Sequence, residues 1–326
     1  MYISWHHWLF VFTAIFHLIA SLRENKILPP LGKLFDINGK KVHLYIKGEG
    51  KATVILDHSL GGIEGYFLID EIAKITRVCI YDRPGYGWSQ SSNKSRCSEV
   101  IVQELNLLLT KAKIEPPYIL VGDSFGSYNM RLYAHKFPDK VKGIILTDGL
   151  HEAGMLNMPV MVKAVKYLFT SGFIMSIFGS LLGLIRLMGT IGLFELIKPE
   201  LKQFDFKQRQ RVKRSFYNHN HWLTMARELI DLNKSGRQLK AADNLGDLPI
   251  ISIKSKSYFK PSVLMILLPL KTINKLRNKI HCNLGLLSKN YTEIPANNSS
   301  HFVWIDEPEI IIQAIKKIAL SHDKLL

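Results

Sequence analysis

The segment VGDSFGS places a serine between two glycines, a spacing typical of a hydrolytic nucleophile. Gly122, Ser124 and Gly126 follow the apolar run YILV and precede the helical pattern SYNMRLYAHKFP. In a strand, turn, helix order the glycines permit a tight turn, which leaves the serine hydroxyl exposed above the sheet. An isolated motif of this kind also occurs in ordinary glycine-rich loops, but its context here predicts that Ser124 is a nucleophile.

A serine hydroxyl is a poor nucleophile at neutral pH, so it needs a histidine base within hydrogen-bond reach. Twelve histidines are available, and His301 is the best placed of them. It follows the expected last strand, YTEIP, and precedes a helix that begins near Pro308. We predict surface positions for His281, between the expected last helix and strand, and for His322 in the terminal tail.

Alternating strand and helix patterns would position these residues. Asn38 and Gly39 form a type I′ hairpin signal between strands expected at 34–37 and 42–47. Five further strands are expected at TVILD, RVCIYDR, YILVGDS, KGIILTDG and LPIISIKS, and SEVIVQELNLLLTKAK is one of the helical patterns between them. Strands alternating with helices predict an α/β fold with a mostly parallel sheet covered on both faces.

Four segments resemble the α/β-hydrolase superfamily in the expected order, and more narrowly a group of bacterial, often membrane-anchored α/β-hydrolases. They are GKLFDINGKKVHLYIKGEG, YDRPGYGWS, PPYILVGDSFGS and LGDLP. The resemblance implies an α/β-hydrolase domain over residues 31–326, with a helical lid inserted at about 151–246. Two positions depart from the family pattern: Asp123 stands where His or Gln is more usual before the nucleophile, and Ser127 stands where a second Gly is common.

The resemblance also indicates where the acid that orients the histidine should lie. Most members carry it just after the strand that follows the lid, but no Asp or Glu occurs from Leu248 to Thr292. The other position used in the superfamily is the end of the preceding strand, and GIILTDGLHE supplies Asp148 there. We predict that Asp148 is the acid of the triad, although an acid at this strand end can also simply turn or cap the chain.

An acyl-transfer site needs two donors aimed at the developing oxyanion. LDHSLGG resembles the family's oxyanion loop, and by that match the amides of Leu60 and Phe125 form the hole. His58 would brace this loop, or be an ordinary strand-end residue. We expect Asp82 and Arg83 of DRPGYGWS to be structural.

The N-terminus is almost entirely apolar over residues 8–22, with no Lys or Arg before Arg23. Such a segment approaches the ~20 residues that span a bilayer. Because Arg23, Lys26 and Lys33 follow it, we predict a single-pass anchor within residues 1–30 and a catalytic domain on the cytoplasmic side. An export signal and a helix lying in the membrane interface are the alternatives.

Composition is consistent with a membrane partner. The formal charge of +16 favours anionic surfaces, and without a nucleic-acid signature the membrane is the better-supported partner. Within the lid, residues 167–197 are strongly apolar, but Arg186 lies inside that run, which argues against a second transmembrane span. The basic residues Lys207, Arg209, Arg211, Lys213 and Arg214 form a solvated helix face or meet lipid headgroups.

These observations together predict a membrane-associated serine hydrolase that cleaves carboxylic esters of a hydrophobic substrate through Ser124, His301 and Asp148. No metal or organic cofactor is implied, and the three cysteines suit neither a metal site nor a disulfide framework. Two alternatives stay open: an acyltransferase that uses the same residues, and a noncatalytic ligand-binding protein on the same fold.

Overall fold

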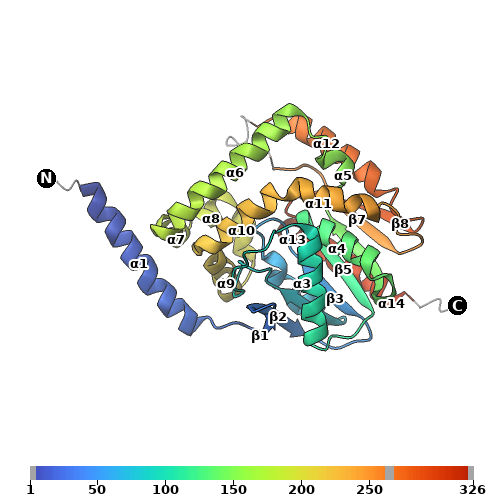
Figure 1. The fold of residues 1–326 in the computed structure, drawn as a ribbon, viewed down its shortest axis with the longest axis horizontal. Helices are drawn as coiled ribbons and strands as arrows, with labels where there is room; N and C mark the ends of the chain where they lie inside the picture. The colour runs from blue at the N-terminus through green and yellow to red at the C-terminus, as the bar shows by residue number, and fades with distance from the viewer. Residues whose placement is uncertain (1–4, 261–267, 322–326) are drawn as a thin grey trace.

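The computed structural model describes residues 5–260 and 268–321, which form a sheet flanked by helices and an extended N-terminal helix (Figure 1). The strands are β1 (Lys33–Ile37), β2 (Lys40–Lys47), β3 (Thr53–Asp57), β4 (Arg77–Tyr81), β5 (Tyr118–Asp123), β6 (Val141–Thr147), β7 (Ile250–Ser255) and β8 (Tyr291–Ala296). The longer helices outside the lid are α1 (Trp5–Ile27), α3 (Ser98–Lys111), α4 (Phe125–Lys136), α12 (Leu270–Leu284) and α14 (Pro308–Leu320). Short helical turns there are η1 (Glu64–Phe67), α2 (Ile69–Ile72), η2 (Pro138–Lys140) and α13 (Val303–Asp306).

The sheet confirms the predicted α/β fold. Its strand order is β1-β2-β4-β3-β5-β6-β7-β8, and the pairs from β4 to β8 are all parallel. β1 and β2 are antiparallel and joined at Asn38 and Gly39, whose φ values of 53° and 77° fit the predicted type I′ turn. β3 and β5 are buried along their whole length, which explains their continuous apolar sequences.

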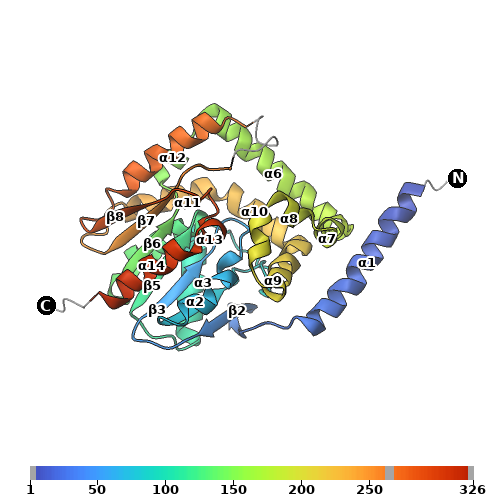
Figure 2. The ribbon, with the colours of Figure 1, turned by 180° about the vertical axis from the view of Figure 1, so that it is seen from behind.

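Helices cover both faces of this sheet. One apolar cluster packs α3 and α4 against the first face, and a second packs α2 and α14 against the other. Figure 2 shows α14 crossing in front of the sheet on this second face. Since the carboxyl ends of parallel strands meet at one edge, residues that follow β5, β6 and β8 are brought together there.

The lid lies between β6 and β7, where the helical insertion was predicted. It contains α5 (Glu152–Met155), α6 (Val160–Leu181), α7 (Leu184–Thr190), α8 (Leu193–Ile197), η3 (Pro199–Gln203), α9 (Phe206–Tyr217), α10 (His219–Ile230), α11 (Leu232–Gln238) and η4 (Leu239–Ala242). The apolar run 167–197 is broken at Gly183 and Gly192, which adopt φ values of 76° and 79° that favour glycine. It is therefore three helices rather than one.

The described residues contain one helix that is long and apolar enough to cross a membrane, and it is α6. Arg186, which was the reason to reject a span in this region, lies outside α6, on α7. Its guanidinium is buried against α1, where it pairs with Glu24 at 2.6 Å and donates to His17 Nδ1 at 3.1 Å. The N-terminal helix thus packs on the lid, and the membrane anchor placed in it stays a prediction.

Candidate active site

Ser124 stands at a sharp turn between β5 and α4. Its backbone adopts φ 47° and ψ −109°, an uncommon conformation for a residue other than glycine. A side chain on Gly126 would meet the backbone oxygen of Asp57 at 2.2 Å, so this position requires glycine. The Ser124 amide donates to the carbonyl of Thr147 on β6 at 3.0 Å, which fixes the turn above the sheet.

His301 and Asp148 meet at the same edge of the sheet. His301 Nδ1 lies 2.6 Å from Asp148 Oδ2, and both residues are buried. The His301 ring stacks on Tyr258 with centroids 4.3 Å apart, and its amide donates to the Tyr258 carbonyl at 3.1 Å. Asp148 thereby holds one ring nitrogen and leaves Nε2 as the nitrogen that can accept a proton.

Asp148 has further partners that the sequence did not indicate. Its Oδ1 lies 3.2 Å from both Arg277 Nη1 and His281 Nε2, on α12, and 3.3 Å from the amide nitrogen of Ser255. Burial would raise the pKa of Asp148, but the hydrogen bonds with His281 and His301 hold it well below its ordinary value. The carboxyl is therefore an anion at neutral pH.

His281 corrects one prediction. It is buried, with 1% of its surface exposed, and does not lie on the surface as expected. The signal was present in the helical spacing of Ile273, Arg277, Ile280 and Leu284, which are buried on the same side of α12. The other histidine assigned to the surface, His322, lies outside the described residues.

Within the described part of the chain, no hydrogen bond joins Ser124 to the His301 ring. Catalytic hydrogen bonds of this kind are often loose without substrate and tighten when it binds. Both residues are buried, at 7% and 6% exposure, and they follow β5 and β8, whose carboxyl ends lie at the same edge of the sheet.

One predicted oxyanion donor directly follows Ser124 in the chain, and the other lies in the loop after β3. Phe125 opens α4, so its amide lies among the first amides of the helix, which have no acceptor within it. Leu60 belongs to the loop after β3. The Arg83 guanidinium holds this loop by donating to the carbonyls of His58 and Ser59 at 2.8 and 3.0 Å. His58 Nδ1 lies 2.9 Å from the Ser59 carbonyl oxygen. Burial and the Arg83 charge hold the pKa of His58 well below its ordinary value, which agrees with a bracing role.

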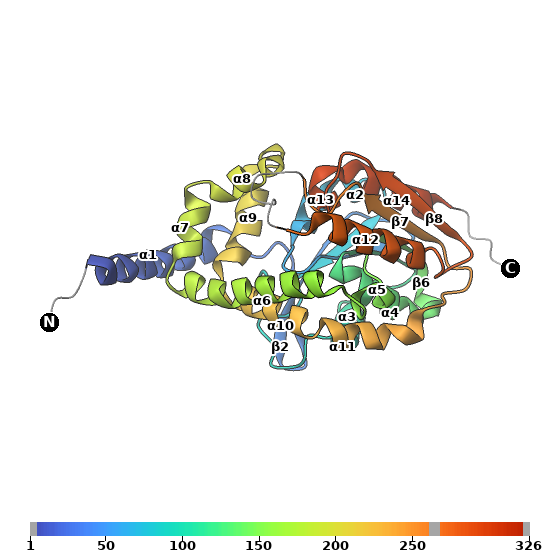
Figure 3. The same cartoon turned by 90° about the horizontal axis from the view of Figure 1, so that it is seen from above.

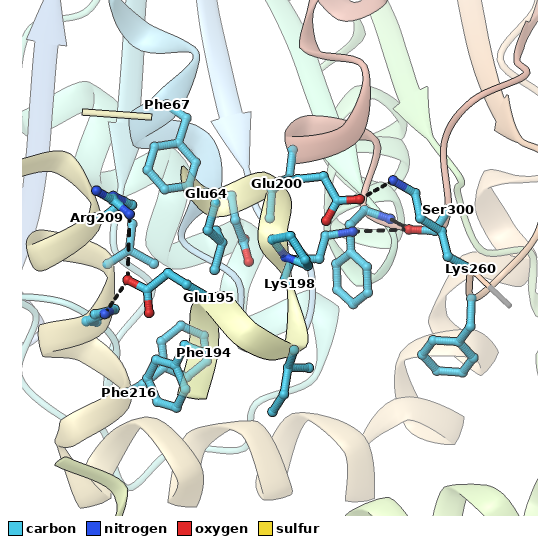
Figure 4. Close-up of a pocket in the computed structure, with 18 of the residues that line it drawn as sticks. Glu64, Phe67, Phe194, Glu195, Lys198, Glu200, Arg209, Phe216, Lys260 and Ser300 are labelled. Atoms are coloured by element: carbon cyan, nitrogen blue, oxygen red, sulfur yellow. Dashed lines mark hydrogen bonds and ion pairs between the residues drawn. The ribbon is translucent and has the colours of Figure 1, made fainter. Parts of the chain in front are cut away.

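Two apolar cavities adjoin the site. A cavity of about 140 Å³ is lined by Asp148 and His301 together with residues of α6, α10 and α12. A larger cavity, of about 480 Å³, lies between η1, the α8 to α9 part of the lid, and the segment Ser300–Phe302 (Figure 4). Most of its charged side chains are paired, as Lys260 is with Glu200, so apart from Glu64 its free lining is mainly aromatic and aliphatic. Phe259 lines both cavities.

Comparisons with known proteins show which family and which solved structures this chain resembles. Residues 52–170 match the model of a family described as the alpha/beta hydrolase fold. The enol-lactonase of Burkholderia xenovorans LB400 superposes with a TM-score of 0.59 at 14% identity, over 87% of this chain and 98% of that one. The chain has the α/β-hydrolase fold.

Sequence relatives of this protein match over shorter stretches. The uncharacterized protein YbdG of Bacillus subtilis is 30% identical over 138 residues, which are 41% of this chain and 42% of that protein. The uncharacterized vacuolar membrane protein YNL115C of Saccharomyces cerevisiae is 34% identical over 139 residues, or 42% of this chain and 19% of the yeast protein. The matches thus span less than half the length of these relatives.

Asp123, one of the two departures from the family pattern, has a defined environment in this structure. The Thr147 hydroxyl donates to its Oδ1 at 2.6 Å, and Trp304 Nε1 donates to that hydroxyl at 2.8 Å. Burial raises the pKa of Asp123 to about 7, although the nearby charge of His301 acts to lower it. Since the pKa of Asp148 is displaced in the opposite direction, Asp148 is the carboxylate that offers a full negative charge to His301.

Arg83 ties the lid of this protein to its core, as a structural residue. Its fully buried guanidinium pairs with Asp57 at the end of β3 at 2.6 Å and with Glu228 of α10 at 2.8 Å. Tyr86 also donates to Glu228, at 2.8 Å. Glu228 was not among the predicted functional residues. Its carboxylate is the lid partner in a buried ion pair that connects the lid to the sheet.

Replacing Arg83 by Met is expected to lower the free energy of unfolding by about 3–5 kcal/mol, because it leaves two buried carboxylates without their cation. Urea unfolding followed by circular dichroism measures this. Lys74→Met is the matched control, since Lys74 forms an exposed pair with Glu71 at 2.6 Å and its loss should cost less than about 1 kcal/mol. Equal effects of the two substitutions would contradict a stabilising role for the Arg83 network.

Proposed function

We propose that this α/β-hydrolase is a serine hydrolase that cleaves carboxylic esters of hydrophobic substrates, with Ser124, His301 and Asp148 as its triad. The observation that carries the proposal is the 2.6 Å contact between His301 Nδ1 and Asp148 Oδ2 beside the strained turn at Ser124. The two apolar cavities next to this pair support a hydrophobic substrate. The similarity to a lactonase, an enzyme for cyclic esters by its name, agrees with ester chemistry.

In the proposed reaction, Ser124 Oγ forms a bond to the ester carbonyl carbon while His301 Nε2 takes the hydroxyl proton. The amides of Leu60 and Phe125 donate to the oxyanion of the tetrahedral intermediate. When the bond to the alcohol oxygen breaks, His301 gives its proton to the leaving alcohol. His301 then removes a proton from a water molecule, whose oxygen attacks the acyl carbon. When the bond to Ser124 Oγ breaks, His301 returns this proton to Ser124 and the acid is released.

Labelling with a fluorophosphonate tests this proposal, because the reagent phosphonylates only a serine that a base activates. Purified protein is expected to be labelled, with the adduct on the peptide that contains Ser124, and heat-unfolded protein is expected to remain unlabelled. An alkyl ester series of increasing acyl length would then show whether kcat/KM rises with chain length, as the apolar cavities predict. Folded protein without an adduct would contradict the proposal and favour a ligand-binding role for the fold.

A further inference from the structure

We propose that the outward faces of α6 and α1 form a docking surface for an anionic phospholipid bilayer, on which α6 lies along the interface. The α6 part of this surface consists of Val160, Met161, Tyr167, Leu168, Met175 and Phe178, whose side chains are 57–81% exposed. The α1 part includes Trp8, Phe12, Leu18 and Leu22, which are 59–69% exposed. The docking surface does not require that the protein is a hydrolase.

The composition of α6 does not suit a helix that faces water. A surface helix of a soluble protein turns a polar face outward, but α6 carries no Asp, Glu, Lys or Arg after Lys166. None of its most apolar 18-residue window is buried inside the structure. Contiguous apolar surface of this kind marks an interaction site.

Packing of the opposite face shows how α6 would meet the bilayer. Val162, Val165 and Phe169 line the smaller cavity with His301, and Phe173 lies against Trp222 of α10 with ring centroids 6.2 Å apart. α10 is in turn held to the core by the buried pair of Glu228 with Arg83. If α6 crossed the membrane, α10 and this ion pair would have to enter the hydrocarbon with it, so α6 lies in the interface instead.

The two helices belong to one side of the molecule. Figures 1 and 3 show α1 and α7 at the end opposite β8 and the C-terminus, with α6 running from α7 toward α5 and α12. The pair of Arg186 with Glu24 fixes α1 to α7, and Arg214 donates to Asn25 at 2.6 Å. α1 therefore cannot turn its apolar side toward the lid without breaking these contacts.

Charge near this surface favours a bilayer over an apolar protein partner. Arg23 and Lys26 at the end of α1, and Lys163 at the start of α6, are exposed beside the apolar side chains. Cations at this position meet the phosphates of an anionic leaflet while the apolar side chains enter below them. The overall charge of +16 adds long-range attraction.

One consequence rests on the proposed function. The helix that faces the bilayer is also a wall of the cavity that His301 lines, because opposite sides of the same helix form the two faces. A hydrophobic ester could thus pass from the lipid to the site beside α6 without crossing bulk water.

A depth-sensitive fluorophore on α6 tests the docking surface. The full chain carries Ser124→Ala, so that binding is measured without hydrolysis, and Cys282→Ser, because Cys282 is the exposed cysteine whereas Cys79 and Cys97 are buried. A nitrobenzoxadiazole group is then attached at Met175→Cys, or at Leu286→Cys as the matched control, since Leu286 is 79% exposed but lies just beyond α12. Vesicles of phosphatidylcholine with phosphatidylglycerol are added.

On these vesicles the emission at residue 175 is expected to rise about twofold or more, with stronger quenching by a nitroxide near the headgroup than by one near the chain end. The probe at residue 286 should not change. Flotation gives a second measurement: Leu168→Glu with Met175→Glu should lower the vesicle partition coefficient at least about tenfold, whereas Leu286→Glu should not.

Three results would overturn the proposal. They are protein that does not float with the vesicles, a probe at residue 175 that is silent while the protein floats, and strongest quenching near the chain end, which would mean that α6 crosses the bilayer. Because the Ser124→Ala protein is used, failure of ester hydrolysis would overturn the proposed function and leave the docking result standing.

Discussion

Replacing His301 by Ala is expected to lower kcat for ester hydrolysis by about 10⁶-fold, and Ser124→Ala should lower it by a similar factor. Ser124 needs His301 to remove its proton, and His301 has this role only when Ser124 is present. Loss of either residue therefore removes the same catalytic step. The double variant should therefore be no slower than either single variant. Stopped-time assays with high protein concentration can measure the residual rates.

His135→Ala is the control for this experiment, because His135 is an exposed histidine near the end of α4. Its kcat should equal that of the wild type. If the losses from His301→Ala and Ser124→Ala multiplied in the double variant, the two residues would act independently and the triad would be wrong.

Asp148→Asn is expected to lower kcat/KM by about 10³–10⁴-fold, because the amide cannot stabilise the imidazolium ion and favours the wrong tautomer of His301. The pH profile supplies a second readout. Burial lowers the pKa of His301, but the hydrogen bond and charge of Asp148 raise it above its ordinary value of 6.5. Activity requires the neutral ring, so wild-type activity should fall as pH drops through this raised pKa. Without the Asp148 charge, that fall should move to lower pH.

His281→Gln separates this role from the packing around Asp148. His281 contacts Oδ1 of the carboxyl group, whereas His301 contacts Oδ2. The substitution should therefore cost less than about tenfold in kcat/KM and leave the tautomer of His301 unchanged. A larger loss from His281→Gln than from Asp148→Asn would show that His281 is the base that Asp148 serves.

Local patterns were sufficient to predict the strands, the hairpin and the turn at Ser124. Each depends on residues that are neighbours in the chain, such as the positive φ values at Asn38 and Gly39 or the close approach at Gly126. The proximity of His301 to Asp148 followed from topology, since both positions come after strands that end at one edge of the sheet.

The surroundings of the site could not be predicted in this way. Glu228 lies 145 positions from Arg83, and nothing in the local sequence of α10 indicates which buried cation it meets. His281 and Arg277 reach Asp148 from a helix whose orientation is set by packing across the whole sheet. The partner of Arg186 could not be predicted for a similar reason, because Glu24 belongs to the N-terminal helix 162 positions earlier.

The buried contact between Arg83 and Glu228 also limits how the lid could be exchanged between related proteins. A transplanted insertion that lacked an acid at the position of Glu228 would leave a guanidinium in the core with Asp57 as its one carboxylate partner among the described residues. Lids of this kind are therefore not independent modules. In evolution or in engineering, α10 and the DRPGYGWS loop would have to change together.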